Sequence, residues 1–283
     1  MEKFRIAAVQ MNALKGDLNH NLDLHRRFSR EAVEAGCRLI QFPELSTTAH
    51  YGDDSVTEFA EEAHRGGIFE TMHGLARELD LVISYGLCER AHGTFYNSQV
   101  LVGPDGFIGV QRKIHASHDE YFHFRMGRSL EVFHLGFCRV GTLICYDGNF
   151  FEGWRVLALK GAEVVLLPHA SRCALGKKRS DRKVLADLKR MLKGLPSRTG
   201  FYAQDNAVFA VFGNQIGYNG HSTHSGGAYI LSPKPEVLAK AEPVMEDLWI
   251  STELDPTALD ASRGRSTLRN RRPEVYDEIA RMI

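Results

Sequence analysis

Short apolar runs alternate with amphipathic stretches along the first part of the chain. Residues 4–11 predict a buried strand, and residues 19–35 carry apolar side chains at helical spacing. Gly36 is well suited to end this helix, and a second apolar run at 37–42 stops at Pro43. This strand–helix–strand alternation is typical of an α/β sheet.

The same pattern continues through the rest of the chain. Helical spacing covers residues 55–80, with a break expected at Gly66-Gly67, and it returns at 151–160. A strong turn signal at 103–106 joins two strands into a hairpin. The strands predicted after residue 80 are 81–87, 96–102, 107–113, 131–135, 137–144, 161–168, 207–213, 227–231, 237–241 and 248–254.

The segment 171–200 is strongly basic and includes an amphipathic helix predicted to run through Leu195. A solvated helix face is the simpler interpretation, and partial cover of an active site is the alternative. Since no linker or repeat interrupts the chain, we expect one domain over residues 1–255. Residues 256–283 form a polar C-terminal tail.

Composition excludes several classes of function. Hydrophobic residues make up 43% and charged residues 25%, as in ordinary globular proteins. Acidic and basic residues balance at 35 each, which predicts no nucleic-acid or membrane partner. The N-terminus lacks the apolar run of a secretory signal, and the five cysteines show no CxxC spacing. These features predict a cytoplasmic protein with reduced thiols and neither disulfides nor a zinc site.

Cys145 lies where a predicted strand ends and a turn leads into a helix. Backbone N–H groups near a helix start favour negative charge, so this position suits a thiolate nucleophile and an oxyanion site. A buried structural cysteine is the alternative. Glu44 and Lys113 also follow predicted strands, where α/β folds place their ligands. In one sheet such strand ends can converge.

Together these residues resemble the nitrilase superfamily of carbon–nitrogen hydrolases, over residues 4–255. Its three sequence blocks occur in order as Phe42-Pro43-Glu44-Leu45, Arg112-Lys113-Ile114-His115 and Ile144-Cys145-Tyr146-Asp147, with Glu152 following. The resemblance implies a four-layer αββα sandwich with a Glu44–Lys113–Cys145 triad. It also implies a second glutamate that positions the lysine and the substrate. Glu120 matches that position, with Asp119 as the adjacent alternative.

The chemistry follows from these residue types. The Lys113 cation is expected to lower the pKa of Cys145, and Glu44 to serve as the general base and acid. Lys113 and the backbone N–H of Tyr146 would bind the oxyanion. The expected steps are a tetrahedral adduct, release of ammonia or amine, a thioester on Cys145 and its hydrolysis. No metal or organic cofactor is required.

The substrate is less well defined by the sequence. Tyr146-Asp147 resembles amidases and N-carbamoyl amidases more than true nitrilases, which typically carry Trp-Glu there. Gly148 and Asn149 stand where D-amino-acid carbamoylases carry carboxylate-binding arginines, so Arg172 or another basic residue in 171–200 becomes the candidate anchor.

Further candidates concern the pocket wall and metals. His50 and Tyr51 both lie near the position of a lining tyrosine of the family, and His169 is a further lining candidate. The pair His221 and His224 lacks an evident third metal ligand, as does the pair His115 and His118, so no metal site is predicted.

We therefore expect a hydrolase that cleaves a non-peptide C–N bond of a small amide or N-carbamoyl amide. A nitrilase acting on a small nitrile is the alternative enzyme, and a non-catalytic scaffold is the third hypothesis. The resemblance also implies a homodimer or larger homo-oligomer, with the tail at 256–283 as a possible contact. An arginine-rich stretch at 263–272 is compatible with such a contact.

Overall fold

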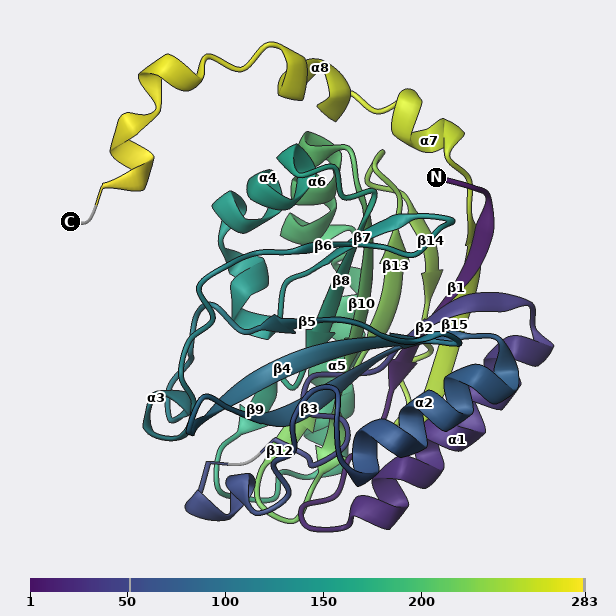
Figure 1. Ribbon diagram of the computed structural model, residues 1–283, viewed down its shortest axis with the longest axis vertical. Helices are drawn as coiled ribbons and strands as arrows, with labels where there is room; N and C mark the ends of the chain where they lie inside the picture. The colour runs from purple at the N-terminus through teal and green to yellow at the C-terminus, as the bar shows by residue number, and fades with distance from the viewer. Residues whose placement is uncertain (51, 282–283) are drawn as a thin grey trace.

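Two six-stranded β-sheets lie face to face at the centre of the molecule, with helices on both outer sides (Figure 1). The computed structural model describes residues 1–50 and 52–281. The helices that cover the first sheet are α1 (Leu18–Glu34) and α2 (Gly67–Leu79). Those that cover the second are α4 (Phe151–Leu159), α5 (Asp181–Lys193) and α6 (Ser197–Asn206). The expected αββα sandwich is confirmed.

Each sheet combines parallel and antiparallel pairs. The first has the order β15-β1-β2-β3-β4-β5 and consists of β1 (Phe4–Gln10), β2 (Cys37–Gln41), β3 (Val82–Ala91), β4 (Thr94–Gly103), β5 (Gly106–Arg112) and β15 (Leu248–Leu254). The second has the order β14-β13-β10-β8-β7-β6 and consists of β6 (Val132–His134), β7 (Arg139–Thr142), β8 (Val164–His169), β10 (Phe209–Asn214), β13 (Ala228–Leu231) and β14 (Val237–Lys240). A small third sheet, absent from the prediction, joins β11 (Ile216–Tyr218), β12 (Thr223–Ser225) and β9 (Arg172–Ala174).

The continuous apolar runs of the strands follow from burial on both faces. In β8, Val164 and Leu166 point between the two sheets, whereas Val165 and Leu167 pack under the outer helices. Side chains alternate along a strand, so a strand in the middle of four layers needs apolar residues at every position. This burial holds the strand ends, and the residues that follow them, in place.

The helix expected over residues 55–80 is wrong in its middle part. The chain forms η1 (Asp54–Thr57) and then α2, with turns between them. Glu61 pairs with β3 instead, because its N–H donates to Cys88 and its carbonyl accepts from Arg90. Its carboxylate accepts the N–H of Ile68 at 2.8 Å and so caps α2. This pairing with a distant strand overrides the local helical pattern.

The sequence pattern does not predict helix α6, which follows Pro196 directly. Its sequence contains Gly200, a poor helix former. The glycine is needed for packing, because a Cβ at this position would lie 2.5 Å from the Cβ of Pro196. Tertiary contact thus stabilises a helix that its own residues favour only weakly.

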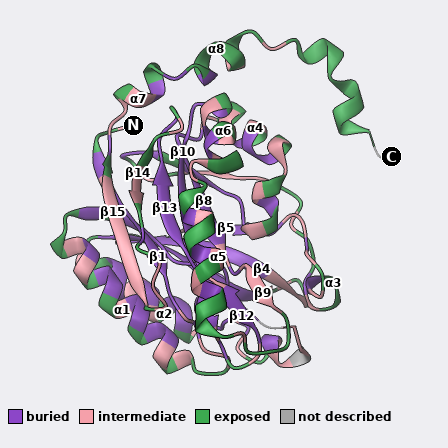
Figure 2. Ribbon diagram, turned by 180° about the vertical axis from the view of Figure 1, so that it is seen from behind, coloured by how far each residue is buried: buried purple, intermediate pink, exposed green. Residues whose placement is uncertain are grey.

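The C-terminal tail leaves the body of the molecule as an extended arm (Figure 1). It contains α7 (Thr257–Asp260), α8 (Gly264–Arg269), η3 (Pro273–Val275) and η4 (Asp277–Ala280). Leu259 is 3% exposed and the Ser262 hydroxyl donates to the Pro233 carbonyl at 3.0 Å, so packing continues past residue 255. Beyond α8 the described residues are mostly exposed (Figure 2). Within the described ranges, no helix combines the length and apolarity needed to cross a membrane.

Candidate active site

Glu44 lies just beyond β2 and is buried by contacts from both sheets. Its Oε1 accepts hydrogen bonds from Lys113 Nζ and Asn97 Nδ2, both at 2.7 Å. Its Oε2 accepts the backbone N–H of Ala170, directly after β8, at 2.8 Å. Buried carboxylates require such partners, so this side chain is fixed in one orientation.

Lys113 follows β5, and its ammonium group lies between two carboxylates. Nζ donates to Glu44 Oε1 at 2.7 Å and to Glu120 Oε1 and Oε2 at 2.8 and 2.7 Å. Asn97, on the neighbouring strand β4, donates to both glutamates and accepts the Lys113 N–H through its backbone carbonyl. Asn97 was not predicted from the sequence, because an asparagine within a strand carries no motif of its own.

Glu120 begins the one-turn helix α3 (Glu120–His123) and is buried. Its Oε2 accepts the N–H and the hydroxyl of Ser117, each at 2.7 Å, and its Oε1 lies 3.2 Å from His50 Nε2. The adjacent Asp119 turns instead towards Arg172. Of the two acidic residues considered from the sequence, Glu120 is the one that contacts Lys113. Tyr51, considered together with His50, lies outside the described residues.

Cys145 is the first residue of the 3-10 helix η2 (Cys145–Asn149) and has a φ of 51°. A left-handed backbone is uncommon for a residue with a side chain and is often found at functional turns. The Cys145 Sγ lies 4.0 Å from the hydroxyl oxygen of Ser171. The N–H of Tyr146 belongs to the first turn of η2, where backbone donors lack intrahelical partners. This turn therefore presents a thiol beside a backbone donor.

The residues converge from two sheets, which corrects the expectation of strand ends in one sheet. Glu44 and Lys113 follow strands of the first sheet, whereas Cys145 and Ala170 follow β7 and β8 of the second. Because the two sheets lie face to face, the ends of these strands bring the four positions to the same end of the sandwich.

Burial and neighbouring charges act in opposite directions on the pKa values of Glu44 and Lys113. Burial by itself would raise the pKa of Glu44, but the Lys113 ammonium outweighs it and the pKa lies below the ordinary value. Burial would lower the pKa of Lys113, but the carboxylates of Glu44 and Glu120 raise it. At neutral pH Glu44 is therefore a carboxylate and Lys113 an ammonium ion.

The expected lowering of the Cys145 pKa by Lys113 is wrong in its net direction. Burial and the negative charge of Glu44 outweigh Lys113 and raise the pKa of this thiol to about 12. The resting group is thus the thiol. Glu44 is ionised and contributes negative charge close to this thiol.

Asp147 connects the two sheets below the cluster. It is buried, and its carboxylate accepts the backbone N–H groups of Ile114 and His115, which follow Lys113, at 3.2 and 2.8 Å. It also accepts the N–H of Ile144, which precedes Cys145, at 3.2 Å. One side chain therefore fixes the position of the Cys145 turn relative to Lys113.

Asp147→Ala is expected to lower kcat about 100-fold, because small displacements between reacting groups are costly. Separate measurements of kcat and KM, with the alkylation rate of Cys145, provide the check. His115→Phe is the matched control, since it removes the 2.8 Å contact between the ring and Asp147 but keeps an aromatic ring to stack on Phe150. A lower melting temperature with an unchanged kcat would contradict a positioning role.

A cavity of about 410 Å³ opens above Cys145. It is lined by His50, Ser117, His118, Tyr146, Asn149 and residues 169–175. The predicted residues Tyr146, His169 and Arg172 all belong to this wall, together with Ser171, which the sequence analysis missed. The His169 ring packs on Phe212, and burial lowers its pKa to about 4, so it is neutral at pH 7.

Within the described ranges, Glu44, His50 and Glu120 place potential metal ligand atoms within 4.8 Å of one another. The Lys113 ammonium already contacts both carboxylates, so this space holds a cation from the chain itself. His221 and His224 gain no third His, Cys or carboxylate ligand among the described residues.

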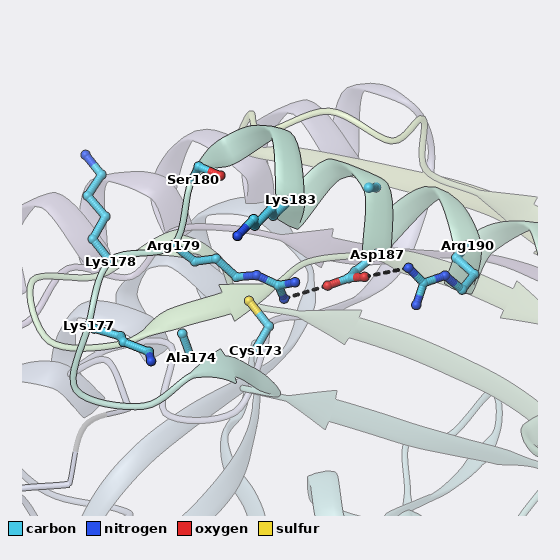
Figure 3. A pocket seen from close by; sticks show the side chains of 10 residues that line it. Cys173, Ala174, Lys177, Lys178, Arg179, Ser180, Lys183, Asp187 and Arg190 are labelled. Atoms are coloured by element: carbon cyan, nitrogen blue, oxygen red, sulfur yellow. Dashed lines mark hydrogen bonds and ion pairs between the residues drawn. The ribbon is translucent and has the colours of Figure 1, made fainter.

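The basic segment divides between two hollows. Its first residues, in β9, line the cavity above Cys145, whereas Lys177 to Arg190 border a separate hollow of about 720 Å³. There Asp187 bridges Arg179 and Arg190 at 2.5 and 2.9 Å, beside Cys173 (Figure 3). Most of the charge that distinguishes the segment therefore lies away from Cys145.

The chain is similar to known carbon–nitrogen hydrolases in sequence and in fold. The family described as carbon–nitrogen hydrolase matches residues 5–263. A nitrilase from Pyrococcus abyssi is 33% identical over 89% of each chain. An N-carbamoylputrescine amidase from Oryza sativa is 28% identical over 97% of this chain and 93% of its own. A carbon–nitrogen hydrolase structure from Helicobacter pylori superposes with a TM-score of 0.84 and 23% identity, covering 99% of both chains.

Proposed function

The chain belongs to the carbon–nitrogen hydrolase family, and from this premise we propose that it hydrolyses a small amide or N-carbamoyl amide through a thioester on Cys145. The observation that supports the proposal best is the Lys113 ammonium held between Glu44 and Glu120 at the cysteine turn. Such an arrangement has a clear catalytic use, because it provides a fixed base and a fixed cation around one thiol.

In the proposed mechanism, Glu44 removes the proton of Cys145 as Sγ attacks the substrate carbonyl carbon. The oxygen of the tetrahedral adduct becomes negative and is stabilised by Lys113 and the N–H of Tyr146. Glu44 returns the proton to the departing nitrogen, the C–N bond breaks, and ammonia or an amine leaves a thioester on Cys145. Glu44 then takes a proton from water as the water attacks the thioester carbon, the C–S bond breaks, Glu44 returns the proton to Cys145 Sγ, and the acid is released.

We assign substrate contact to the wall of the cavity above Cys145. Tyr146 is 40% exposed, so its ring can contact a bound substrate, and His169 presents a neutral ring. Arg172 of this wall is also proposed, as is Tyr51 from the sequence resemblance alone, since it lies outside the described residues. The amide and N-carbamoyl classes are favoured by Tyr146-Asp147 after the nucleophile. A nitrilase remains the second candidate, because the relative from Pyrococcus abyssi is named a nitrilase.

The test is ammonia release from a panel of simple amides, ureido acids, carbamoyl amines and nitriles, with Cys145→Ala as the control. Release from one class that disappears in the variant would support the proposal and select the substrate class. Release that persists in Cys145→Ala would overturn the role of the thiol. Silence across the panel would favour the non-catalytic scaffold.

We also propose that the exposed tail mediates a homodimer or larger homo-oligomer. Val275 and Ile279 are 63% and 64% exposed, on an arm that extends from the body (Figure 1). Removal of residues 265–283 is expected to lower the mass in light scattering coupled to gel filtration. The matched control is Val237→Ser, which removes an exposed apolar side chain on β14 instead. An unchanged mass after truncation would rule out the tail as the contact.

A further inference from the structure

Arg172 is the charged member of the cavity wall above Cys145 within the described part of the chain; the other lining residues are neutral or histidine. Its guanidinium binds the Asp119 carboxylate through both terminal nitrogens, and the Nη1–Oδ2 distance is 2.8 Å. The side chains are 10% and 18% exposed, respectively. A two-pronged, largely desolvated pair of this kind is strong and geometrically specific.

Several neighbours hold this pair in place. Arg172 begins β9, and its backbone pairs with His224 of β12. Asp119 immediately precedes Glu120, which is fixed by Lys113. Gly52 closes over the carboxylate, because a Cβ at this position would lie 1.6 Å from Asp119 Oδ2. A ligand that required a different arrangement of the pair would have to displace packed groups.

The charge balance beneath the cavity is negative. With the His50 ring neutral at 3.2 Å from Glu120 Oε1, Glu44 and Glu120 contribute two carboxylates against the ammonium of Lys113, while Asp119 and Arg172 cancel each other. A substrate carboxylate would approach this negative cluster and find Arg172, the cation of the described cavity wall, already bound to Asp119. An uncharged or amine-bearing substrate meets neither obstacle.

We propose that the Asp119–Arg172 pair makes this site select uncharged or amine-bearing amides and ureas, and reject those that carry a carboxylate near the scissile bond. This inference rests on the proposed function and narrows its substrate class. It also reverses the expected use of Arg172 as a carboxylate anchor. The Arg172 side chain forms part of the cavity wall, and its charge is neutralised by Asp119.

Alkylation of Cys145 tests the selection without requiring hydrolysis. Iodoacetamide and iodoacetate differ mainly by one negative charge, and each rate is read from the Cys145 peptide by mass spectrometry. Each rate is divided by the rate of the same reagent with glutathione. For wild type we expect the normalised rate with iodoacetamide to exceed the normalised rate with iodoacetate at least about tenfold. Each factor of ten corresponds to roughly 1.4 kcal/mol of discrimination.

Asp119→Asn keeps the shape of the side chain but frees the charge of Arg172. We expect it to reduce the preference for iodoacetamide about tenfold. The double variant Asp119→Asn/Arg172→Met removes the freed cation and should restore the preference. Asp260→Asn, which removes an equal charge from the surface pair with Arg265, should leave the ratio unchanged. Partial unfolding would move the ratio of any variant towards that of glutathione, so the restored preference in the double variant distinguishes the charge effect from unfolding.

A wild-type ratio equal to that of glutathione, or an unaltered ratio in Asp119→Asn, would overturn the inference. The same variants are then compared by kcat/KM for butyramide and succinamate, which differ by a terminal carboxylate. Alkylation ratios as expected without hydrolysis of any amide would leave the charge selection intact and refute the proposed function. Hydrolysis of both amides at equal rates by wild type would refute the selection alone.

Discussion

Glu44→Gln is expected to lower kcat/KM about 1000-fold while leaving the fold intact, a loss typical of a missing general base. Glutamine keeps an oxygen to accept from Lys113 and Asn97 but cannot take the proton of Cys145. The loss should be large because burial, the largest cause of the raised pKa of Cys145, persists in the variant and keeps this thiol protonated without a base. Steady-state kinetics on the best substrate of the panel provide the measurement.

The matched control is Glu89→Gln. Glu89 is also a buried carboxylate and binds Arg112 through both oxygens, but it lies outside the cluster at Cys145. The substitution Glu89→Gln should lower the stability of the protein with little change in kcat. Retention of more than a tenth of the activity in Glu44→Gln would exclude Glu44 as the base.

The pH profile of wild type gives a second check on Glu44. Since Lys113 lowers the pKa of Glu44, the active carboxylate form persists below the ordinary value of about 4.3. Activity should therefore fall on the acid side only as pH drops through this lowered pKa. An acid limb near pH 6 would show that the carboxyl group is protonated too readily to act as proposed.

Lys113→Met is expected to abolish hydrolysis and to lower the free energy of unfolding at pH 7 by about 3–5 kcal/mol. The substitution leaves Glu44 and Glu120 buried beside each other without their cation. Two such carboxylates cannot both remain ionised at low cost, because they repel each other and are removed from water. Chemical denaturation followed by fluorescence measures the change.

The pH dependence of this variant should have the opposite sign from wild type. In wild type the pKa of Glu120 lies well below its ordinary value, so its contribution is present above about pH 4.3 and is lost on acidification. In Lys113→Met the folded-state pKa values of the two glutamates rise above the unfolded value. The variant should thus gain stability as pH falls from 7 towards 5.

Glu120→Gln added to Lys113→Met is the matched control, because it removes the second buried charge. Part of the lost stability should return at pH 7, without any return of activity. A Lys113→Met protein as stable as wild type, or one that loses stability on acidification from pH 7, would contradict this account of the cluster.

The sequence predicted the local parts of the site well. Buried strands need apolar residues on both faces, so runs such as 137–144 and 161–168 are visible without knowledge of their neighbours. The residues after such runs, Glu44, Lys113 and Cys145, lie at strand ends in the structure as well. The helix over 58–66 failed because Glu61 pairs with β3, a contact that lies outside any local window.

By itself, the sequence determined the layered fold, the family and the residues offered for chemistry, because periodicity and motifs are properties of neighbouring positions. The tertiary structure alone decided that the site joins two sheets, that Asn97 binds both glutamates and that Asp119 neutralises Arg172. It also reversed the expected pKa shift of Cys145. Charge and desolvation act through space, and here they come from segments more than a hundred residues apart in the chain, as with Glu44 and Cys145.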